Sequence, residues 1–491
     1  MESYITEHLE LPKRICLPAD TEVTPELIEK LIKIQEEDNK RYEILQGYYE
    51  GKAKIFERKK DEKKSNNKLV LDYPSYIVDV LLGLFVGKPI SYTVQEEDKE
   101  RMEAIQEILD LNDEQDENTE IAKMIGIKGK GYEIVYVDEE SNIRFNEVNP
   151  DNVVMVYDDK INPEPLFAIY QVNLFDEETV GKESKDKKIF VYTRESIKEY
   201  IKAKGEMYLV DESINPFGEV PVIEFLNNNE AIGDFERVLP LIDAMNLAQS
   251  DTANDFEEFT NAILVLLGNL DTDSEDILQL IEDRVLLLRE GEGANWLIKE
   301  INDTALENYK IRLDADIHKF AKVPNMNDEN FAGNVSGESM KYKLFATNQI
   351  IAQKQRKFKT ALQTRLRLII NAMGIKSGLD FDYRSISVVF NENTPFNELD
   401  NINTVKAALD AGLSKQYALG KLRDIDDIGE ELKRQEDEQD AYADYYLRDK
   451  DEELSENADR VREVSEKQGE GTDDQLQGDL WGYKKRTFKN L

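Results

Sequence analysis

The stretch Lys322–Lys341, KVPNMNDENFAGNVSGESMK, separates two long helical patterns of this chain. The first pattern ends at Pro324, because proline lacks the N–H group that a continuing helix would need. Asn, Asp and Gly dominate the next residues, as is typical of a loop. The helical pattern that follows, roughly residues 336–373, would span about 50–55 Å at 1.5 Å per residue. Such a length predicts a helix that crosses a whole domain.

Before the quoted stretch, the sequence predicts a helical hairpin with a small insertion. Residues 234–267 place apolar side chains at helical spacing and acidic side chains on the opposite face. A second helix is predicted over Asp303–Ala321. The residues between the helices, 268–300, alternate short helical and strand-like pieces and include Trp296. Two helices that flank a compact insertion are typical of a stalk with a cap on its end.

The long helix after the quoted stretch is basic, although the chain as a whole is acidic. Between Glu338 and Met373 its only acidic residue is Glu338, against Lys341, Lys343, Lys354, Arg356, Lys357, Lys359, Arg365 and Arg367. These cations could face DNA, or they could bind acidic faces of neighbouring subunits. We favour the second interpretation, because something must offset the repulsion between subunits this acidic.

The remainder predicts a mixed α+β fold that is mainly helical. Thr24-Pro25-Glu26 is typical of a helix start, because a capping hydroxyl, proline and an acid suit the first turn. Further helices are predicted after Pro74 and over 98–109, 119–130, 195–204, 397–411 and 414–422. Alternating apolar and polar residues predict strands over 131–138, 143–148, 153–157, 167–174, 188–193, 220–225 and 385–390.

Composition limits the class of protein. The 491 residues are enough for two or three domains, and their net charge of −39 argues against a free-standing nucleic-acid binder. The single cysteine, Cys16, cannot form an internal disulfide, which fits a reducing compartment. The acidic N-terminus does not resemble a signal peptide. The apolar run Ile77–Val86 contains Asp79 and has about half the length that spans a bilayer, so no membrane partner is expected.

Recognisable catalytic motifs are missing from the sequence. Three glycine-rich stretches, Gly47–Lys52, Gly83–Lys88 and Gly126–Gly131, lack the spacing of a phosphate-binding loop. Two histidines and one cysteine give no basis for a zinc site. Acidic clusters at 271–276 and 424–427 could bind divalent ions, but solvated turns explain them better. We therefore expect no enzyme activity, no cofactor and no metal.

Three strings in consistent order carry a resemblance to a known family. They are NNKLVLDYPSYIVDVLLGLFVGKPISY at 66–92, NPFGEVPVIEF with the following helix at 215–268, and IHKFAKVPNMNDENFAGNVSGESMKYKL at 317–344. With them the chain resembles the portal, or head–tail connector, proteins of tailed bacteriophages. The likeness covers most of residues 42–431 and is to the branch typical of long-tailed phages of Gram-positive hosts.

The resemblance implies a portal fold with wing, stem, clip and crown, assembled as a ring with an axial channel. Its parts would fall at 1–233 for an N-terminal arm and wing, 234–267 and 303–323 for the stem helices, and 268–302 for the clip. A tunnel loop would occupy 324–335, the long basic helix and a returning wing strand 336–396, the crown 397–435, and an acidic, partly disordered tail 436–491.

The same resemblance implies a non-enzymatic conduit at one capsid vertex of the virion, assembled in the host cytoplasm. A dodecameric ring would admit double-stranded DNA from the terminase large subunit and later release it toward the tail. Other expected partners are a head–tail adaptor, the scaffold and the major capsid protein, with a role in starting procapsid assembly. The alternatives are a virion scaffold or tail structural protein without a DNA channel, and a metal-dependent nuclease.

Residue roles also follow from the resemblance. The tunnel loop would present Pro324, Asn325, Asn327, Asp328, Glu329, Asn330 and Asn334, whose polar groups could contact phosphates weakly. The stem acids Asp255, Glu257 and Glu258 would line the channel and let DNA slide, whereas a basic lumen would hold it. The terminase would dock on the clip at Asp271, Asp273, Glu275, Asp276 and Trp296.

Overall fold

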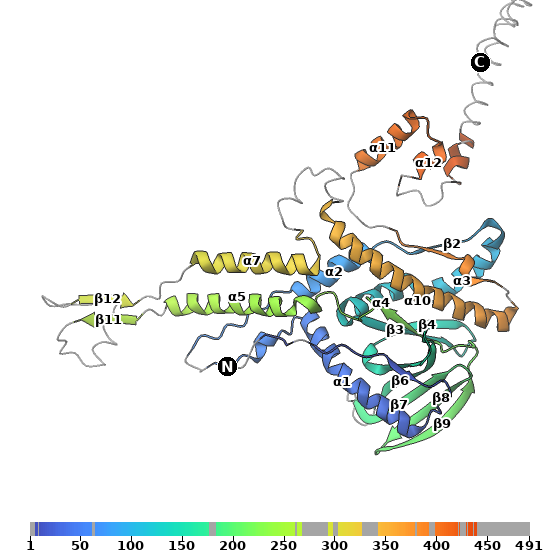
Figure 1. Ribbon diagram of the computed structural model, residues 1–491, viewed down its shortest axis with the longest axis horizontal. Coiled ribbons are helices and arrows are strands. Elements are labelled where there is room, and N and C mark those ends of the chain that lie inside the picture. The colour runs from blue at the N-terminus through green and yellow to red at the C-terminus, as the bar shows by residue number, and fades with distance from the viewer. Residues whose placement is uncertain are drawn as a thin grey trace, which may run out of the picture. The chain divides into compact units, whose positions relative to one another are not determined.

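The computed structural model describes most of the first 420 residues. These are 5–7, 9–60, 64–175, 183–260, 263–267, 293–297, 303–326, 342–378, 381–391 and 398–420, with scattered positions between 422 and 438. The chain divides into two compact units, Met1–Pro395 and Phe396–Leu491 (Figure 1). The second unit contains α11 (Glu398–Asp410) and α12 (Lys415–Leu419), close to the two helices predicted there.

A six-stranded sheet forms one side of the first unit. Its order is β1 (Ile15–Leu17), β5 (Val153–Asp158), β6 (Pro165–Phe175), β7 (Glu183–Thr193), β8 (Ser196–Ala203) and β9 (Glu206–Ile214). All neighbours are antiparallel except β1, which is parallel to β5. Helix α1 (Pro25–Tyr49) covers one face through Ile28, Leu31 and Ile32, and the hydroxyl of Thr24 caps its first turn as predicted.

The predicted helix over 195–204 is wrong, because these residues form β8. Tyr200 lies opposite Ile189 of β7 and Leu209 of β9, so the segment has a hydrogen-bonded strand on each side. The repeated Lys and Glu residues give this segment a helix-like charge spacing. Pairing on both edges outweighs that weak local preference. Strand β9 was not predicted at all.

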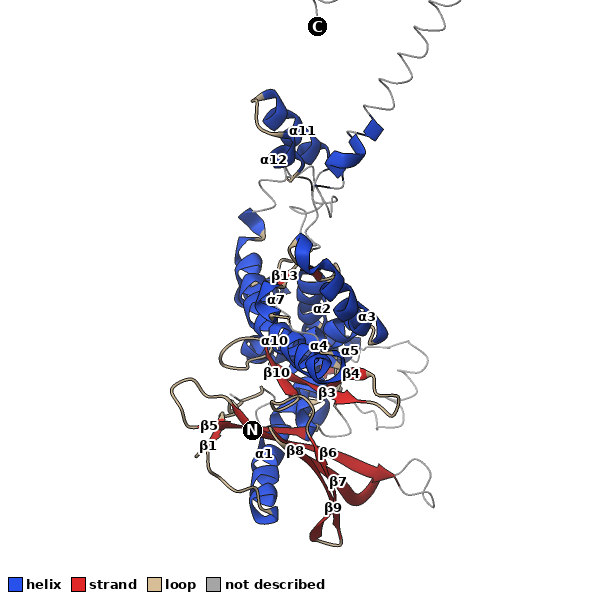
Figure 2. Ribbon diagram, turned by 90° about the vertical axis from the view of Figure 1, so that its right-hand side faces the viewer, coloured by secondary structure: helices blue, strands red, loops and turns tan. Residues whose placement is uncertain are grey.

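Two further layers follow the large sheet (Figure 2). A three-stranded sheet, β10 (Val222–Leu226), β3 (Lys130–Val137) and β4 (Ile143–Val148), packs against it through Tyr132 and Val222. Its other face packs on a helical layer. That layer contains α2 (Tyr73–Val86), α3 (Lys99–Leu111), α4 (Glu114–Lys128) and α10 (Phe345–Ser377).

Helix α10 is the long basic helix of the sequence, and its centre is buried. The ring of Phe358 is fully buried, with its centroid 4.8 Å from that of Phe225 and 5.3 Å from that of Phe85. The predicted stop at Gly374 is wrong, because the helix continues to a left-handed Gly378 at φ 72°. The predicted start near residue 336 lies outside the described residues.

Glycines at the end of α4 and before α5 permit a close approach of two backbones. Gly129 ends α4 with φ 86°, and a Cβ atom there would lie 1.9 Å from the carbonyl oxygen of Ala231. A Cβ on Gly233 would lie 2.3 Å from the carbonyl oxygen of Ile127. The end of α4 and the loop before α5 therefore fit together only without these side-chain atoms.

Helices α5 (Leu239–Thr260) and α7 (Asp303–Ala321) lie side by side as the predicted hairpin (Figure 1). The bounds of α7 match the prediction. The predicted first helix, 234–267, is too long, because α5 ends at Thr260 and Ile263–Leu267 is strand β11. This strand pairs antiparallel with β12 (Gly293–Leu297), so the two ends of the insertion meet.

A small ladder joins the returning segment to the helical layer. Strand β2 (Ser91–Thr93) pairs antiparallel with β13 (Ser387–Val389), which lies within the strand predicted at 385–390. Among the described residues, no helix is both long enough and apolar enough to cross a membrane.

Candidate functional site

The hairpin of α5 and α7 exposes large apolar side chains. Phe256 of α5 is 56% exposed, and Ile311 and Phe320 of α7 are 64% and 56% exposed. Leu313 and Ile317 lie on the side of α7 away from Ile311, and both are buried in the core of the first unit. One face of the hairpin is thus packed by its own chain and another is not.

A polar face of α5 binds an extended segment of the same chain. Asn246, Ser250 and Asn254 stand four residues apart, and their side-chain oxygens accept the backbone N–H groups of Leu71, Leu69 and Asn67, at 2.7–2.9 Å. Four helical residues rise about 6.0 Å and two extended residues about 6.6 Å, so the two spacings match. The ladder ties α5 to the chain that enters α2.

The predicted channel acids lie next to this ladder. Asp255 is half-buried, whereas Glu257 is exposed and accepts a hydrogen bond from the side-chain amide of Asn67 at 2.7 Å. Glu258 belongs to α5, but the structure does not describe its side chain. At least one of the three predicted acids therefore points away from the core.

The end of α7 forms a compact joint with α2. Tyr73 donates a hydrogen bond to Oδ1 of Asp314 at 2.7 Å, and Tyr76 donates one to the carbonyl oxygen of Pro324 at 2.9 Å. The N–H of Met326 donates to the same Tyr76 hydroxyl at 2.9 Å. The imidazole of His318 lies edge-on to both tyrosine rings, at centroid distances of 6.0 and 5.6 Å. We call these residues the loop-root joint.

The basic side chains at the centre of α10 have partners within the same chain. Arg365 is fully buried, and its guanidinium binds the carboxylates of Glu133 and Glu114 and the amide oxygen of Asn118. Lys354 binds the carboxylate of Asp234 at 2.5 Å. Neither interpretation offered from the sequence, DNA or neighbouring subunits, anticipated this third role.

Burial and charge oppose each other in this cluster. Burial by itself would lower the pKa of Arg365, but the carboxylate of Glu133 raises it overall. Burial raises the pKa of Glu114, although the positive charge of Arg365 acts in the other direction. The guanidinium thus stays charged, and its primary counter-charge is Glu133.

A family model described as "Phage portal protein, SPP1 Gp6-like" matches residues 28–445. The chain belongs to this family of portal proteins. The curated portal protein of Bacillus phage SPP1 is 25% identical over 403 residues, which cover 78% of each chain. The solved neck of a native GTA particle with C12 symmetry has 12% identity and a TM-score of 0.44, covering 70% of this chain and 88% of that one. At that TM-score the likeness supports no conclusion about this chain.

Membership identifies a structural protein of the phage head–tail connector and places it at the capsid vertex of the virion. The portal resemblance inferred from the three strings is confirmed, as is the mixed, mainly helical α+β class. The boundaries predicted for wing, stem, clip and crown stay predictions.

Most predicted contact residues of this portal protein fall outside the described chain. Of the residues predicted to act in the tunnel loop, Pro324 and Asn325 are described. Pro324 belongs to the loop-root joint, and the side-chain amide of Asn325 donates to Oδ2 of Asp314 in that joint at 3.4 Å. The other predicted loop residues lie outside the described part of the chain: Asn327, Asp328, Glu329, Asn330 and Asn334. The predicted clip acids Asp271, Asp273, Glu275 and Asp276 are outside it as well. Trp296 lies in β12 opposite Leu264 of β11, and its side chain is not described.

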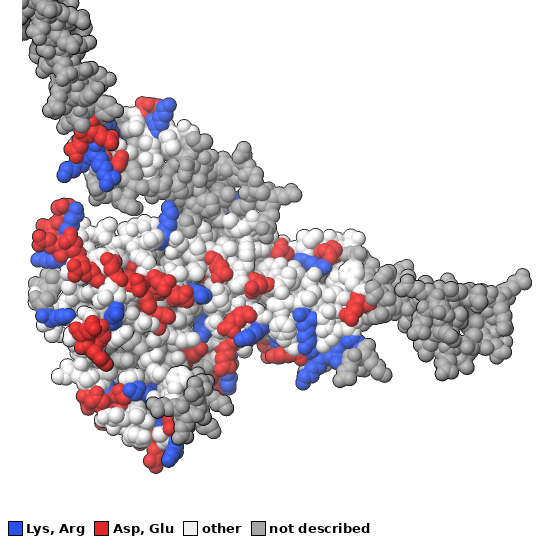
Figure 3. All heavy atoms as spheres, turned by 180° about the vertical axis from the view of Figure 1, so that it is seen from behind, with Lys and Arg blue, Asp and Glu red and all other residues white. Residues whose placement is uncertain are grey.

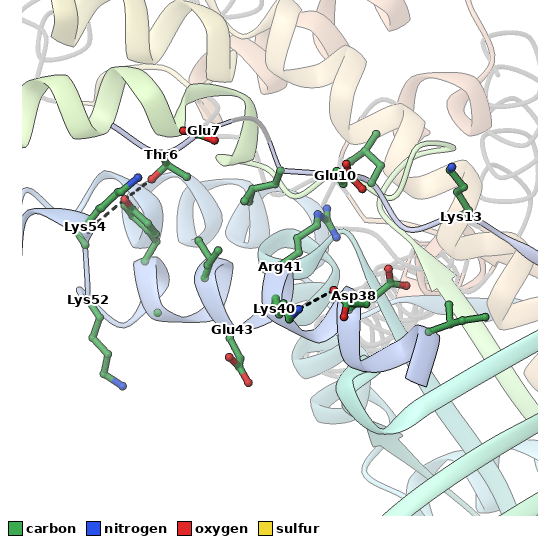
Figure 4. Close-up of a pocket in the computed structure, with 18 of the residues that line it drawn as sticks. Thr6, Glu7, Glu10, Lys13, Asp38, Lys40, Arg41, Glu43, Lys52 and Lys54 are labelled. Atoms are coloured by element: carbon green, nitrogen blue, oxygen red, sulfur yellow. Dashed lines mark hydrogen bonds and ion pairs between the residues drawn. The ribbon is translucent and has the colours of Figure 1, made fainter. Parts of the chain in front are cut away.

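The portal chain also has a cavity of about 1090 Å³ between its N-terminal segment and α1 (Figure 4). Basic side chains, including Lys13, Lys52 and Lys54, and acidic ones, including Glu10 and Glu43, line it together. Figure 3 shows the same mixture across one face, where acidic side chains are widespread and basic ones are scattered between them. Among the described residues no group of His, Cys, Asp and Glu could hold a metal ion.

Proposed function

We propose that this portal protein assembles into a closed ring whose axial channel conducts double-stranded DNA through one capsid vertex. The observation that carries the proposal is the family match over residues 28–445. The uncovered apolar side chains of the α5–α7 hairpin support it. Phe256, Ile311 and Phe320 would be buried if hairpins of neighbouring copies packed side by side, and each square ångström of apolar surface removed from water contributes about 25 cal/mol.

The chemistry of packaging would belong to partners. A terminase large subunit would supply the work and dock on the insertion bounded by β11 and β12. A head–tail adaptor would bind after packaging, and scaffold and major capsid protein would surround the ring during assembly in the host cytoplasm. A ring of twelve copies is the arrangement that the family resemblance implies.

The stem acids support weak rather than strong DNA contact. Double-stranded DNA carries one phosphate charge per about 1.7 Å of its axis, so basic residues in a channel would bind it and slow it. Glu257 is exposed on α5, near Asp255 and Glu258 in sequence, and would repel the phosphates. Pro324 and Asn325 would lead into the loop that narrows the channel.

Two measurements test the proposal. Negative-stain images of purified protein should show rings with an axial hole, whereas a compact monomer would refute ring formation. Glu257→Lys should slow DNA packaging in a terminase-driven assay, because it adds a phosphate-binding charge to the channel. Glu206→Lys, an equal charge change on the exposed strand β9, is the matched control and should leave the rate unchanged. If both variants packaged DNA at the rate of the natural protein, Glu257 would not line the channel.

A further inference from the structure

The loop-root joint fixes the backbone path, and one hydroxyl group makes the critical contacts. Tyr73 and Tyr76 stand three residues apart on α2, so they project from the same face of that helix. Tyr73 contacts the side chain of Asp314, within α7. Tyr76 instead contacts two backbone groups beyond the end of α7, the carbonyl of Pro324 and the N–H of Met326. It therefore holds the chain itself at both sides of Asn325.

The backbone just after α7 forms a hydrogen bond back to the helix at Val323, and the following proline cannot form one. Lys322 adopts the left-handed conformation at φ 58°, and the N–H of Val323 returns to the carbonyl oxygen of His318 at 3.1 Å. The next residue, Pro324, has no N–H to donate. The N–H of Met326 donates to the Tyr76 hydroxyl, so a side chain of α2 binds the backbone just beyond this proline.

The chain that comes back toward α10 meets the same joint. The hydroxyl of Thr347, in the first turn of α10, donates to the carbonyl oxygen of Lys322 at 2.7 Å. Residues on both sides of positions 327–341 are thus held at one place, where α2, α7 and α10 meet. A displacement of α2 would act on this place through the Tyr76 hydroxyl, which contacts Pro324 and Met326.

We propose that Tyr76 is a positioning residue for DNA passage, which sets where the chain leaves the stem and couples that point to α2. The inference rests on the proposed function, because it assigns Tyr76 a role in the same channel. Tyr76 does not touch the DNA. It acts through Pro324 and Met326, whose direction it fixes.

Tyr76→Phe tests the contact directly, because it removes the hydroxyl and keeps the ring against His318. In full-length protein, hydrogen–deuterium exchange resolved to single amides should become about three- to tenfold faster at Met326, the loss expected for one hydrogen bond. Exchange at Val323 should stay unchanged, because His318 accepts its N–H. Unchanged exchange at Met326 would overturn the proposal, since the hydroxyl would then not hold the chain.

The matched control is Tyr49→Phe. Tyr49 is also half-buried, and its hydroxyl donates to Asp79 of α2 at 3.0 Å, away from the joint. It therefore removes a tyrosine hydroxyl bonded to the same helix without touching residues 322–326. Exchange at Met326 should not respond to this variant. A response would show a general loosening of α2 and would overturn the assignment to Tyr76.

The second readout is DNA packaging by rings of each variant with a terminase. Rings of Tyr76→Phe should assemble as the natural protein does but package DNA several-fold more slowly, whereas Tyr49→Phe rings should keep the natural rate. Natural packaging by Tyr76→Phe rings with faster Met326 exchange would overturn the positioning role. Failure of the natural protein itself to form rings or to support packaging would refute the proposed function instead, so the two failures are distinguishable.

Discussion

The layer around α10 and the hairpin of α5 and α7 differ in how far their side chains are satisfied within one chain. The first buries charged groups with their partners, and the second exposes large apolar groups. Around α10, even a fully buried guanidinium, that of Arg365, has all its ionic partners within the chain. On the hairpin, Phe256 and Ile311 remain more than half exposed although both are large and apolar. One region is complete in a single copy, and the other has surface that a second copy could cover.

This difference separates stability from assembly. Changes around α10 should act on the free energy of unfolding of each copy, because its contacts are internal. Changes on the exposed side of the hairpin should act on the association of copies, because more than half of the surface of Phe256 and of Ile311 is not covered by their own chain. The four variants below test that division, from the largest expected effect to the smallest.

Arg365→Met should give the largest loss of stability. It leaves Glu133 buried without its counter-charge, and breaking a buried ion pair costs about 3–5 kcal/mol. Arg367→Met is the control two residues away, because Arg367 is one-third exposed and pairs with a similarly exposed Glu219. Its cost should be about 0–1 kcal/mol. Urea unfolding measures both, and equal losses would contradict a self-contained core.

Gly129→Ala should be the next most harmful change. Gly129 and Gly205 have nearly the same φ, 86° and 88°, so alanine at either position is strained by about 1–2 kcal/mol. Only at Gly129 does the new Cβ meet a backbone atom, the carbonyl oxygen of Ala231. Gly129→Ala should therefore lose about 1–3 kcal/mol more than Gly205→Ala in thermal unfolding. Similar losses would mean that the close approach does not matter.

Replacing Ile311 and Phe256 by Gln should leave the unfolding free energy of each copy within about 0.5 kcal/mol of the natural value. The same variant should form fewer rings in negative stain, because it removes apolar area from the face assigned to neighbouring copies. Ile161→Gln, at another exposed apolar side chain but outside the hairpin, should not change the ring fraction. If the variant lowered the unfolding free energy of each copy but formed the natural fraction of rings, the hairpin face would serve stability rather than assembly.

At pH 5, Glu117→Gln should have the smallest effect of the four, and a difference should appear only as the pH rises. Burial, followed by a hydrogen bond with Glu147, raises the pKa of Glu117 to about 8. Between its ordinary pKa and that value the folded chain binds a proton that the unfolded chain lacks, so stability falls as pH rises through this window.

The glutamine variant cannot ionise, and it should therefore gain stability relative to the natural protein between pH 5 and pH 8.5. Glu120→Gln is the control on the same helix, where the carboxylate is exposed and paired with Lys123. Urea midpoints at the two pH values measure the difference. A parallel pH dependence for all three proteins would contradict the assigned shift.

Local signals in the sequence were sufficient for elements that carry their own start and stop. Thr24 and Pro25 begin α1, and Pro324 follows the end of α7, as predicted. The prediction was wrong for strand β8, because the conformation of this segment depends on its partners in β7 and β9 rather than on its own residues. The predicted helix included the residues of β11 for the same reason, since the partner of this strand, β12, lies at the other end of the insertion.

The site was less accessible to sequence reasoning than the fold. Tyr76 and Pro324 are 248 positions apart, and Arg365 and Glu133 are 232 apart, so no spacing pattern connects them. The ladder of Asn246, Ser250 and Asn254 does have a readable signal, a polar residue at every fourth position of an otherwise core-facing helix. On the polar face of this helix, only the acidic residues have a role in the prediction from sequence.

The pairing of β11 with β12 has a consequence for how this protein can change in evolution. The ladder closes the insertion at its base, so the helices on either side are held together whatever lies beyond Leu267 and Gly293. Each doubling of a closed loop costs only about 0.6 kcal/mol in chain entropy. The enclosed residues can therefore vary in length and composition while α5 and α7 keep their alignment. Under the proposed docking of a terminase on this insertion, a lineage that exchanges its terminase would need to change only the enclosed segment.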